Sequence, residues 1–358
     1  MSKSFKFGLI FLVTILLLPI TRMMFAESSL SSNLTDWLFS IFFQIVCLGI
    51  IPFVLYKLLI TKKTSSFFVD TKIKSKISLS IIIYAITIGL CVYVLNIIIS
   101  TYVQFLFKKA GFTYSSGVNT IFSSPEVLIL EIATSAILPA VFEEVTNRGL
   151  LLNALTDIKR DSTKLILVGL LFGLVHQNVS QFVSAFIIGI ILAQVALKAR
   201  SIIPAMIIHF INNFLIIMSS YSEQTNDTYY NFLNNLFTII ISYPILTIII
   251  VAFTIFGIYY GIREIDKLQK INHDKNELSS IHFSSHNINS TSKGEDIEDT
   301  NDFNYVFFNN NVSKNTDEYE ARKPLNPLKK LYNHMPLIIA VTITTITTIF
   351  TFIWGLLR

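Results

Sequence analysis

Nine mainly apolar stretches recur along this chain, and most approach the roughly 20 residues that a helix needs to cross the hydrocarbon layer of a bilayer. Hydrophobic residues make up 52% of the sequence and charged residues only 14%, which is unlike an ordinary soluble domain. The sequence therefore predicts an all-α fold, a polytopic transmembrane helix bundle of about nine spans. The stretches lie near residues 5–25, 37–60, 78–107, 126–150, 164–177, 179–197, 201–219, 236–260 and 337–357.

The polar residues divide the chain into five parts. The loop at 261–336 is rich in Asn, Ser, Asp, Glu and Lys and too poor in apolar residues to order a core, so we expect it to be disordered and cytoplasmic. Its His273, His282 and His286 lack companion cysteines and a regular ligand spacing, which argues against a metal site there. The other parts are N-terminal transmembrane helices at 1–125, a core of four helices carrying the site at 126–218, an additional transmembrane helix at 219–260 and a C-terminal transmembrane helix at 337–358.

Basic residues gather in alternate gaps between the predicted spans, with Lys108 and Lys109 as the one contrary pair, and cytoplasmic loops are the ones enriched in Lys and Arg. This bias predicts a multi-pass plasma-membrane protein with its N-terminus in the cytoplasm and its C-terminus outside. We expect the first stretch to be a retained anchor, although Lys3, Lys6 and Ala26 are also compatible with a cleaved signal peptide. The net charge of +5 thus reports orientation and not nucleic-acid binding. The basic loop residues are Lys62, Lys63, Lys72, Lys74, Lys76, Lys159, Arg160, Lys164, Lys198 and Arg200.

One predicted span contains the run Val-Phe-Glu-Glu-Val-Thr-Asn-Arg-Gly, with Glu143, Glu144 and Arg148. Charges inside a membrane are costly, so each of these is a candidate functional residue. Glu144 and Arg148 stand four apart and share a helix face, where the guanidinium can neutralise the carboxylate. Glu143 points about a quarter-turn away, and its carboxylate stays free. Glu131 lies about 18 Å from Glu143 along the helix axis and is interpreted as an interfacial or packing residue.

Two further spans carry polar residues with the same spacing. Phe172 precedes His176 by one turn and can shield it from solvent, and His209 with Asn213 can address one bound group together. Counted from the nearest cytoplasmic loop, Glu143, His176 and Asn213 lie roughly 18 to 21 Å along their helices. His209 lies about 14 Å along its helix. All four are therefore expected near the middle of the membrane, at similar depths.

The motifs Glu-Glu-x-x-x-Arg, Phe-x-x-x-His and His-x-x-x-Asn occur here in this order. Together they resemble the CPBP family of intramembrane proteases, which includes CAAX-protease-like and lysostaphin-resistance-protein-A-like proteins with an Abi domain. The resemblance covers roughly residues 126–218 and implies a CAAX-protease-like intramembrane catalytic core. One departure is Asn147, where the family commonly has an aromatic residue before the arginine; it affects packing or substrate fit but removes no catalytic group.

The resemblance implies an intramembrane endopeptidase that cleaves a membrane-embedded or membrane-associated peptide or protein, which enters from the bilayer or the cytoplasmic side. Glu143 is the expected general base for the attacking water, and His176 would hold and polarise that water. His209 and Asn213 would donate hydrogen bonds to the oxyanion of the tetrahedral intermediate. The supporting residues are Glu144, Arg148 and Phe172.

A divalent metal such as zinc is the competing version of this chemistry, since Glu143, His176 and His209 are all acceptable ligands. The sequence has no His-Glu-x-x-His motif, and Cys47 and Cys91 both lie inside apolar stretches. We therefore favour a metal-free mechanism and leave the cofactor open.

Two other functional classes fit the same residues. A protease-like core can serve as a non-catalytic membrane scaffold, because fold does not fix function. Acidic and histidine residues at mid-membrane also build proton-coupled or ion-coupled transporters, but no matching broken helices occur in two halves of this chain. The expected partners are the lipid bilayer and a peptide substrate, and the frequent use of Asn, Ile and Lys hints at a bacterial plasma membrane.

Overall fold

The computed structural model describes residues 1–26, 32–73, 77–111, 120–291 and 327–356, and within these residues it contains helices and no strands. The predicted all-α helix bundle is confirmed. Contacts divide the chain into one unit of Met1–Gln269 with Asn333–Arg358 and a second unit of Lys270–Tyr332. The first unit carries all the candidate site residues. Its first helices are α1 (Lys3–Ala26), α2 (Ser32–Ile41), η1 (Phe42–Ile50), α3 (Ile51–Leu59), α4 (Thr64–Asp70) and α5 (Leu79–Lys109).

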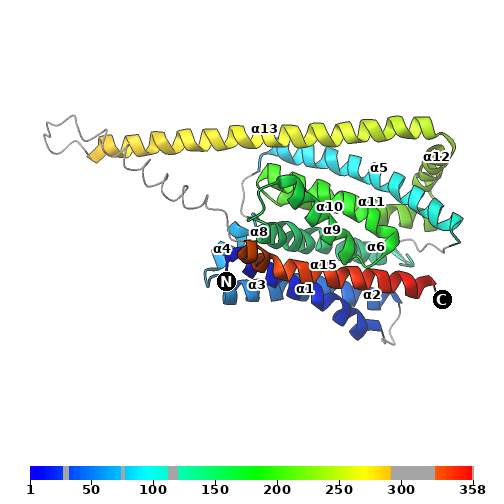
Figure 1. Cartoon of the computed structure of the whole chain (residues 1–358). Helices are drawn as coiled ribbons and strands as arrows, with labels where there is room; N and C mark the ends of the chain where they lie inside the picture. The colour runs from blue at the N-terminus through cyan, green and yellow to red at the C-terminus, as the bar shows by residue number, and fades with distance from the viewer. Residues whose placement is uncertain (27–31, 74–76, 112–119, 292–326, 357–358) are drawn as a thin grey trace. The chain divides into compact units, whose positions relative to one another are not determined.

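The candidate residues all lie in the central part of the chain, whose helices include α9, α10 and α11 (Figure 1). One continuous span, Pro125–Ala154, is built from five consecutive segments. They are α6 (Pro125–Ile132), η2 (Ala133–Ile137), α7 (Leu138–Glu144), η3 (Val145–Leu151) and α8 (Leu152–Ala154). They are followed by α9 (Asp161–Val175), α10 (Val179–Ala199), α11 (Ile203–Thr225), α12 (Thr228–Ser242), α13 (Pro244–Thr291) and α15 (Pro327–Leu356).

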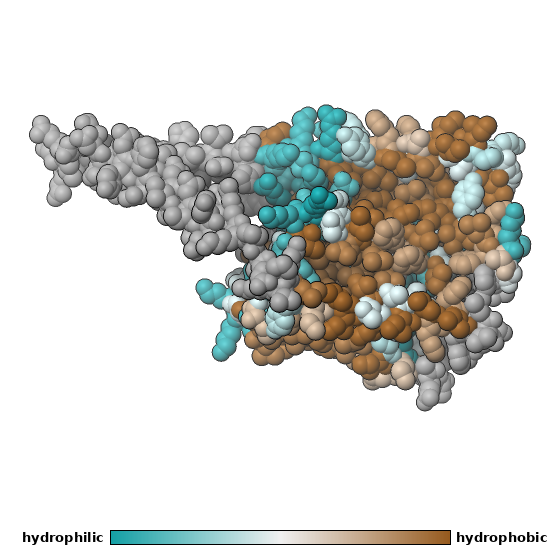
Figure 2. Space-filling model, viewed as in Figure 1, coloured by the Kyte–Doolittle hydropathy of each residue, from teal (hydrophilic) through white to brown (hydrophobic). Residues whose placement is uncertain are grey.

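Eight segments of the described chain are long and apolar enough to cross a membrane, so this is a multi-pass membrane protein. The predicted stretch 164–177 corresponds to α9, whose 15 residues extend only about 22 Å and fall short of a full span. Apolar side chains cover most of the visible surface, and hydrophilic ones gather mainly near helix ends (Figure 2). Outward-facing residues such as Phe253, 76% exposed, and Ile248, 68% exposed, are suited to contact with lipid.

The helices differ from the sequence prediction after residue 219. The single helix expected at 236–260 is split, because α12 ends at Ser242 and α13 begins at Pro244, a residue that favours the first turn of a helix. The prediction of a loop throughout 261–336 was wrong for 261–291, which continue α13, and for 327–336, which begin α15. Charged side chains one turn apart, such as Glu264 and Lys267 at 3.7 Å, support this longer helix. The rest of that loop, and the side chains of its three histidines at 273, 282 and 286, lie outside the described residues.

Glycines allow α9 and α10 to pack in close contact. A Cβ atom on Gly169 would lie 2.6 Å from Ile190 Cγ1 and 2.8 Å from the carbonyl oxygen of Phe186. A Cβ atom on Gly189 would lie 2.9 Å from the Cα of Gly169. Small residues at helix interfaces are a common means of close packing in membranes. This contact fixes α9, which carries His176 at its end, against α10.

We expect Gly169→Ala to lower the free energy of unfolding by about 1 to 3 kcal/mol, because the new methyl group meets backbone that cannot move aside. Thermal unfolding of the purified protein in detergent measures this loss. Gly8→Ala is the matched control, since its Cβ would have ordinary contacts of 3.5 Å or more and helix propensity favours alanine. Equal melting temperatures for the two variants would contradict the close contact.

Candidate active site

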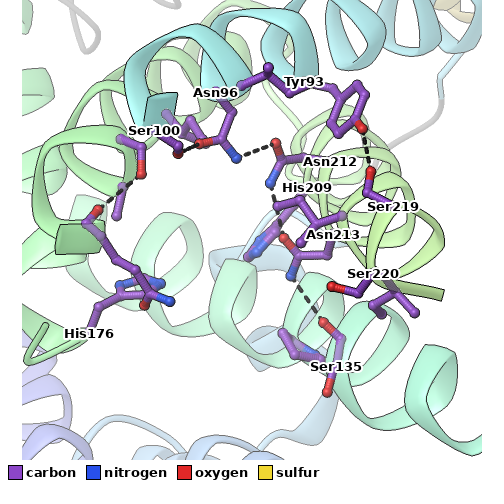
Figure 3. A pocket seen from close by; sticks show the side chains of 18 of the residues that line it. Tyr93, Asn96, Ser100, Ser135, His176, His209, Asn212, Asn213, Ser219 and Ser220 are labelled. Atoms are coloured by element: carbon purple, nitrogen blue, oxygen red, sulfur yellow. Dashed lines mark hydrogen bonds between the residues drawn. The ribbon is translucent and has the colours of Figure 1, made fainter. Parts of the chain in front are cut away.

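A cavity of about 610 Å³ lies inside the first unit and is lined by side chains from ten of its helical segments and from the turn after α9. The four predicted catalytic residues, Glu143, His176, His209 and Asn213, all line it. Glu143 comes from α7, His176 from the end of α9, and the other two from α11. Figure 3 shows His176 on one side of the cavity and His209 with Asn213 on the other. The fold thus gathers around one space the residues that the sequence separates by up to 70 positions.

Glu143 is half-buried at the cavity wall, and its carboxylate has one defined partner. Oε1 accepts a hydrogen bond of 2.9 Å from Nε2 of Gln44 in η1. Among the described residues no hydrogen bond engages Oε2, so this oxygen can accept one from a bound group. The backbone carbonyl of Glu143 accepts a 2.8 Å bond from Nδ2 of Asn147, the buried residue at the position where the sequence departs from the family pattern. Oδ1 of Asn147 has no hydrogen-bond partner in the described part of the chain.

Glu144 and Arg148 form a fully buried ion pair behind the cavity wall. Oε1 of Glu144 accepts hydrogen bonds from Nη1 of Arg148 at 2.7 Å and from Nδ1 of His209 at 2.8 Å. Nη2 of Arg148 donates to the carbonyl oxygen of Gly189 at 3.0 Å. The guanidinium also lies 4.6 Å from the ring centre of Phe172, a cation–π distance. The predicted pair is therefore confirmed, and it connects the span 125–154 to α9, α10 and α11.

The hydrogen bonds of the two histidines define which ring nitrogen is available. The backbone N–H of His176 bonds to Gly173, three residues back, which leaves the carbonyl of Phe172 free. Nδ1 of His176 lies 2.7 Å from that carbonyl oxygen, which only accepts, so Nδ1 carries the proton and Nε2 has a lone pair. In His209, Nδ1 donates to Glu144, and Nε2 is again the nitrogen left for a bound group. The Phe172 ring packs against both imidazoles, with centroid distances of 5.0 and 5.8 Å.

A chain of amides orients Asn213. Nδ2 of Asn212 donates to Oδ1 of Asn213 at 3.1 Å, and Asn212 itself accepts from Nδ2 of Asn96 at 3.0 Å. Nδ2 of Asn213 then donates to the carbonyl oxygen of Ser135 at 3.1 Å, which leaves its second N–H for the cavity (Figure 3). Sequence reasoning missed Asn96 and Asn212, although both are polar residues inside apolar spans and that signal was visible.

A local break in the hydrogen bonding of the span 125–154 leaves the Ser135 carbonyl free to accept the hydrogen bond from Asn213. Pro139 has no N–H to donate to the carbonyl of Ser135, four residues back. In the π-helical turn η2, the N–H of Leu138 bonds to Ala133, five residues back, so the carbonyl of Thr134 also loses its usual partner. Side chains take their place: Asn213 donates to Ser135, and Oγ of Ser40 donates to Thr134 at 2.7 Å. π-Helical turns often occur at functional sites.

Glu131 lines a part of the same cavity distant from Glu143. It is buried, and its Oε2 accepts hydrogen bonds from Nε1 of Trp37 at 2.8 Å and from Oγ1 of Thr120 at 2.7 Å. These bonds join α6 to α2 and to Thr120, five residues before α6, which is the packing role that the sequence suggested for Glu131.

The described residues contain no group of three or more His, Cys, Asp or Glu side chains arranged to hold a metal ion. The three residues expected as possible metal ligands, Glu143, His176 and His209, line the same cavity but do not form such a group.

Comparison with known proteins gives one match. Residues 125–215 match the family model described as type II CAAX prenyl endopeptidase Rce1-like, which is a protease family. The match covers about a quarter of the chain and includes every candidate site residue. No curated protein and no solved structure matches the chain. The predicted resemblance to the CAAX-protease-like family is confirmed for this segment.

We expect Arg148→Ala to lower the free energy of unfolding by about 3 to 5 kcal/mol, because it leaves the Glu144 carboxylate buried without its counter-charge. The double variant Glu144→Gln with Arg148→Met should recover at least half of this loss, since it removes both charges and keeps an acceptor for His209. Thermal unfolding in detergent measures both. If the double variant were no more stable than Arg148→Ala, the charge pair would not be the source of the loss.

Proposed function

We propose that this protein, whose residues 125–215 match the Rce1-like endopeptidase family model, is an intramembrane endopeptidase that hydrolyses a peptide bond with water activated by Glu143. The observation that carries the proposal is the lining of one cavity. It combines a carboxylate with a free oxygen, an imidazole with a free lone pair and two groups able to donate hydrogen bonds. These are the parts that water attack on a carbonyl needs.

In the first step, a water molecule lies between Glu143 and His176. Its oxygen attacks the carbonyl carbon of the substrate while Oε2 of Glu143 takes one of its protons. Nε2 of His176 accepts a hydrogen bond from the second O–H, since its Nδ1–H is held by the carbonyl of Phe172. Gln44 holds the other oxygen of Glu143 and so fixes the direction from which the base approaches.

The oxyanion of the tetrahedral intermediate receives hydrogen bonds from Asn213 and His209. Asn213 has a second N–H, because its Oδ1 and one N–H are already used by Asn212 and Ser135. His209 donates Nδ1–H to Glu144, so it can also donate from Nε2 only in its protonated form, and Glu144 is the adjacent counter-charge for that form. Donors fixed in advance commonly contribute several kcal/mol to such a step, roughly 3 to 4 for one donor.

The intermediate then collapses with loss of the amine. Protonated Glu143 returns its proton to the substrate nitrogen, the C–N bond breaks, and a carboxylic acid and an amine leave. Every proton is accounted for by water, Glu143 and the substrate, and no serine or cysteine nucleophile takes part. A bound divalent ion would supply Lewis-acid activation of the water, and whether cleavage needs one is an outcome of the test below.

The remaining features of the proposal follow from the sequence. The substrate is a membrane-embedded or membrane-associated peptide or protein, and the enzyme works in the plasma membrane with its N-terminus in the cytoplasm. A scaffold that binds such a segment without cleaving it, and a proton-coupled or ion-coupled transporter, use the same buried residues, so activity is the property that separates the three.

We expect the purified wild-type protein to cleave members of a membrane-peptide library, and Glu143→Gln and His176→Ala each to lower kcat/KM by roughly 100-fold or more, since each removes a group that handles the proton or the water. Mass spectrometry of the products, with and without a chelator, gives the rates. Glu126→Gln is the matched control, because this exposed glutamate lies in the same span but does not line the cavity.

Survival of cleavage in chelator favours the metal-free mechanism, and loss that is restored by zinc favours the metal-dependent one. If the wild-type protein cleaved nothing while all variants folded equally well, the protease function would be wrong, and the protein would be a scaffold or a transporter.

A further inference from the structure

The cavity occupies only one end of the helices that surround it. On α5 its first lining residue, Tyr93, follows the helix start at Leu79 by about 21 Å. On the span 125–154 its last lining residue is Glu143, about 16 Å before Ala154. On α10 the last is Ile188, about 16 Å before the end of that helix.

The basic loops lie at the other end of these helices, where they converge. Lys72, before α5, lies close to Lys164 on α9 and Arg200 after α10. Burial first, and then the charges of these two residues, lower the pKa of Lys72 from its ordinary value. The carbonyl oxygen of Lys72 also accepts a 3.5 Å hydrogen bond from Oγ of Ser201. By the positive-inside rule this end faces the cytoplasm.

A packed apolar layer separates the cavity from this basic end. Its residues are at most 1% exposed and come from the span 125–154 with the residue that follows it, α9 and α10, so they leave no room for a peptide. They are Leu150, Leu151, Leu155, Val168, Leu171, Leu192, Val195 and Ala196.

The exposed part of the cavity lining lies at the opposite end. Three lining residues are exposed: Arg22, near the end of α1, Glu223, near the end of α11, and Asn234 on α12. The lining residues nearest the basic loops are buried, among them Ile188 and His209. Water and solutes therefore reach Glu143 from the end that carries the exposed residues.

The cavity wall is suited to a hydrophilic chain. Between the mouth and Glu143 it presents amide and hydroxyl groups, including Asn96, Ser100, Ser219 and Ser220 (Figure 3). Burial of a peptide group without hydrogen bonds costs several kcal/mol, roughly 2 to 7, and this lining supplies the partners. From Glu131 to Glu143 the cavity extends about 18 Å, the length of five or six residues of extended peptide.

We infer that the cavity takes an extended hydrophilic peptide segment of about five residues, which enters from the non-cytoplasmic face of the membrane. The inference rests on the proposed protease function and differs from the entry from the bilayer or cytoplasm that the sequence suggested. The substrate is then a segment exposed on the outer side of the membrane, such as the polar region next to a transmembrane helix or an exported peptide.

Thiol labelling tests the direction of entry without any need for cleavage. In full-length protein with Cys47 and Cys91 replaced by Ala, Ser220→Cys should react with a membrane-impermeant charged thiol reagent added to the non-cytoplasmic side of intact cells. Met218→Cys, two residues away and outside the lining, should stay unlabelled. Asp161→Cys, whose native side chain is 69% exposed beside a basic loop, should react only in inside-out vesicles.

Labelling of Ser220→Cys only from the cytoplasmic side, or from neither side, would overturn the inference, as would labelling of Asp161→Cys from outside. If labelling follows the inference while the wild-type protein cleaves no peptide, the entry route stands and the protease function fails.

Whether the cavity prefers a hydrophilic peptide is tested by asking which peptides protect Ser220→Cys from the thiol reagent. In the Glu143→Gln background, a pool of six-residue peptides of Ser, Asn, Lys and Ala should slow labelling of Ser220→Cys at least threefold. A matched pool of Leu, Ile, Phe and Val should leave the rate unchanged. Equal protection by the two pools, or none by either, would overturn the hydrophilic substrate class.

Discussion

A carboxylate buried among membrane helices persists in charged form only when a counter-charge and hydrogen bonds compensate for the lost water, and Glu144 has both. Its Oε1 accepts hydrogen bonds from Arg148 and His209 at distances of up to 2.8 Å. Arg148 also donates to the Gly189 carbonyl and lies over the Phe172 ring. The same ring packs against His176. Four helical segments are thus held at one point, and the histidines that face the cavity take their orientation from it.

The cavity itself depends on backbone groups that the helices leave unpaired. A regular helix uses all its internal N–H and C=O groups, so a wall of regular helices offers only side chains. Here Pro139 and the π-helical turn before it free the carbonyls of Thr134 and Ser135, and the end of α9 frees that of Phe172. Each freed carbonyl is bonded by a side chain from the cavity region. The site is therefore built where local helix geometry is interrupted.

Contacts within one helix could be predicted from the sequence, because a spacing of four places two side chains on the same face. That is why the Glu144–Arg148 pair and the packing of Phe172 on His176 were foreseen. Contacts between helices could not, since they depend on the rotation of each helix about its axis. The bond from Gln44 to Glu143 and the amide chain through Asn212 are of this kind.

Two helix ends after residue 219 were predicted wrongly, for opposite reasons. The stretch 236–260 is uniformly apolar, so its break at Pro244 was overlooked, although proline at the start of a helix is a known signal. Beyond residue 260 the chain becomes polar, and we expected a loop. Charged residues at helical spacing instead continue α13, which shows that polarity alone does not end a helix.

The central claim is that Glu143 activates a water molecule that attacks the substrate directly. A single turnover in H₂¹⁸O with enzyme in excess over a cleavable peptide tests it, with mass analysis of the new C-terminal carboxyl group. Direct attack predicts one ¹⁸O atom in the product of the first turnover. An unlabelled first product, with ¹⁸O appearing in the Glu143 side chain, would mean that the carboxylate had acted as a nucleophile, and would contradict the account.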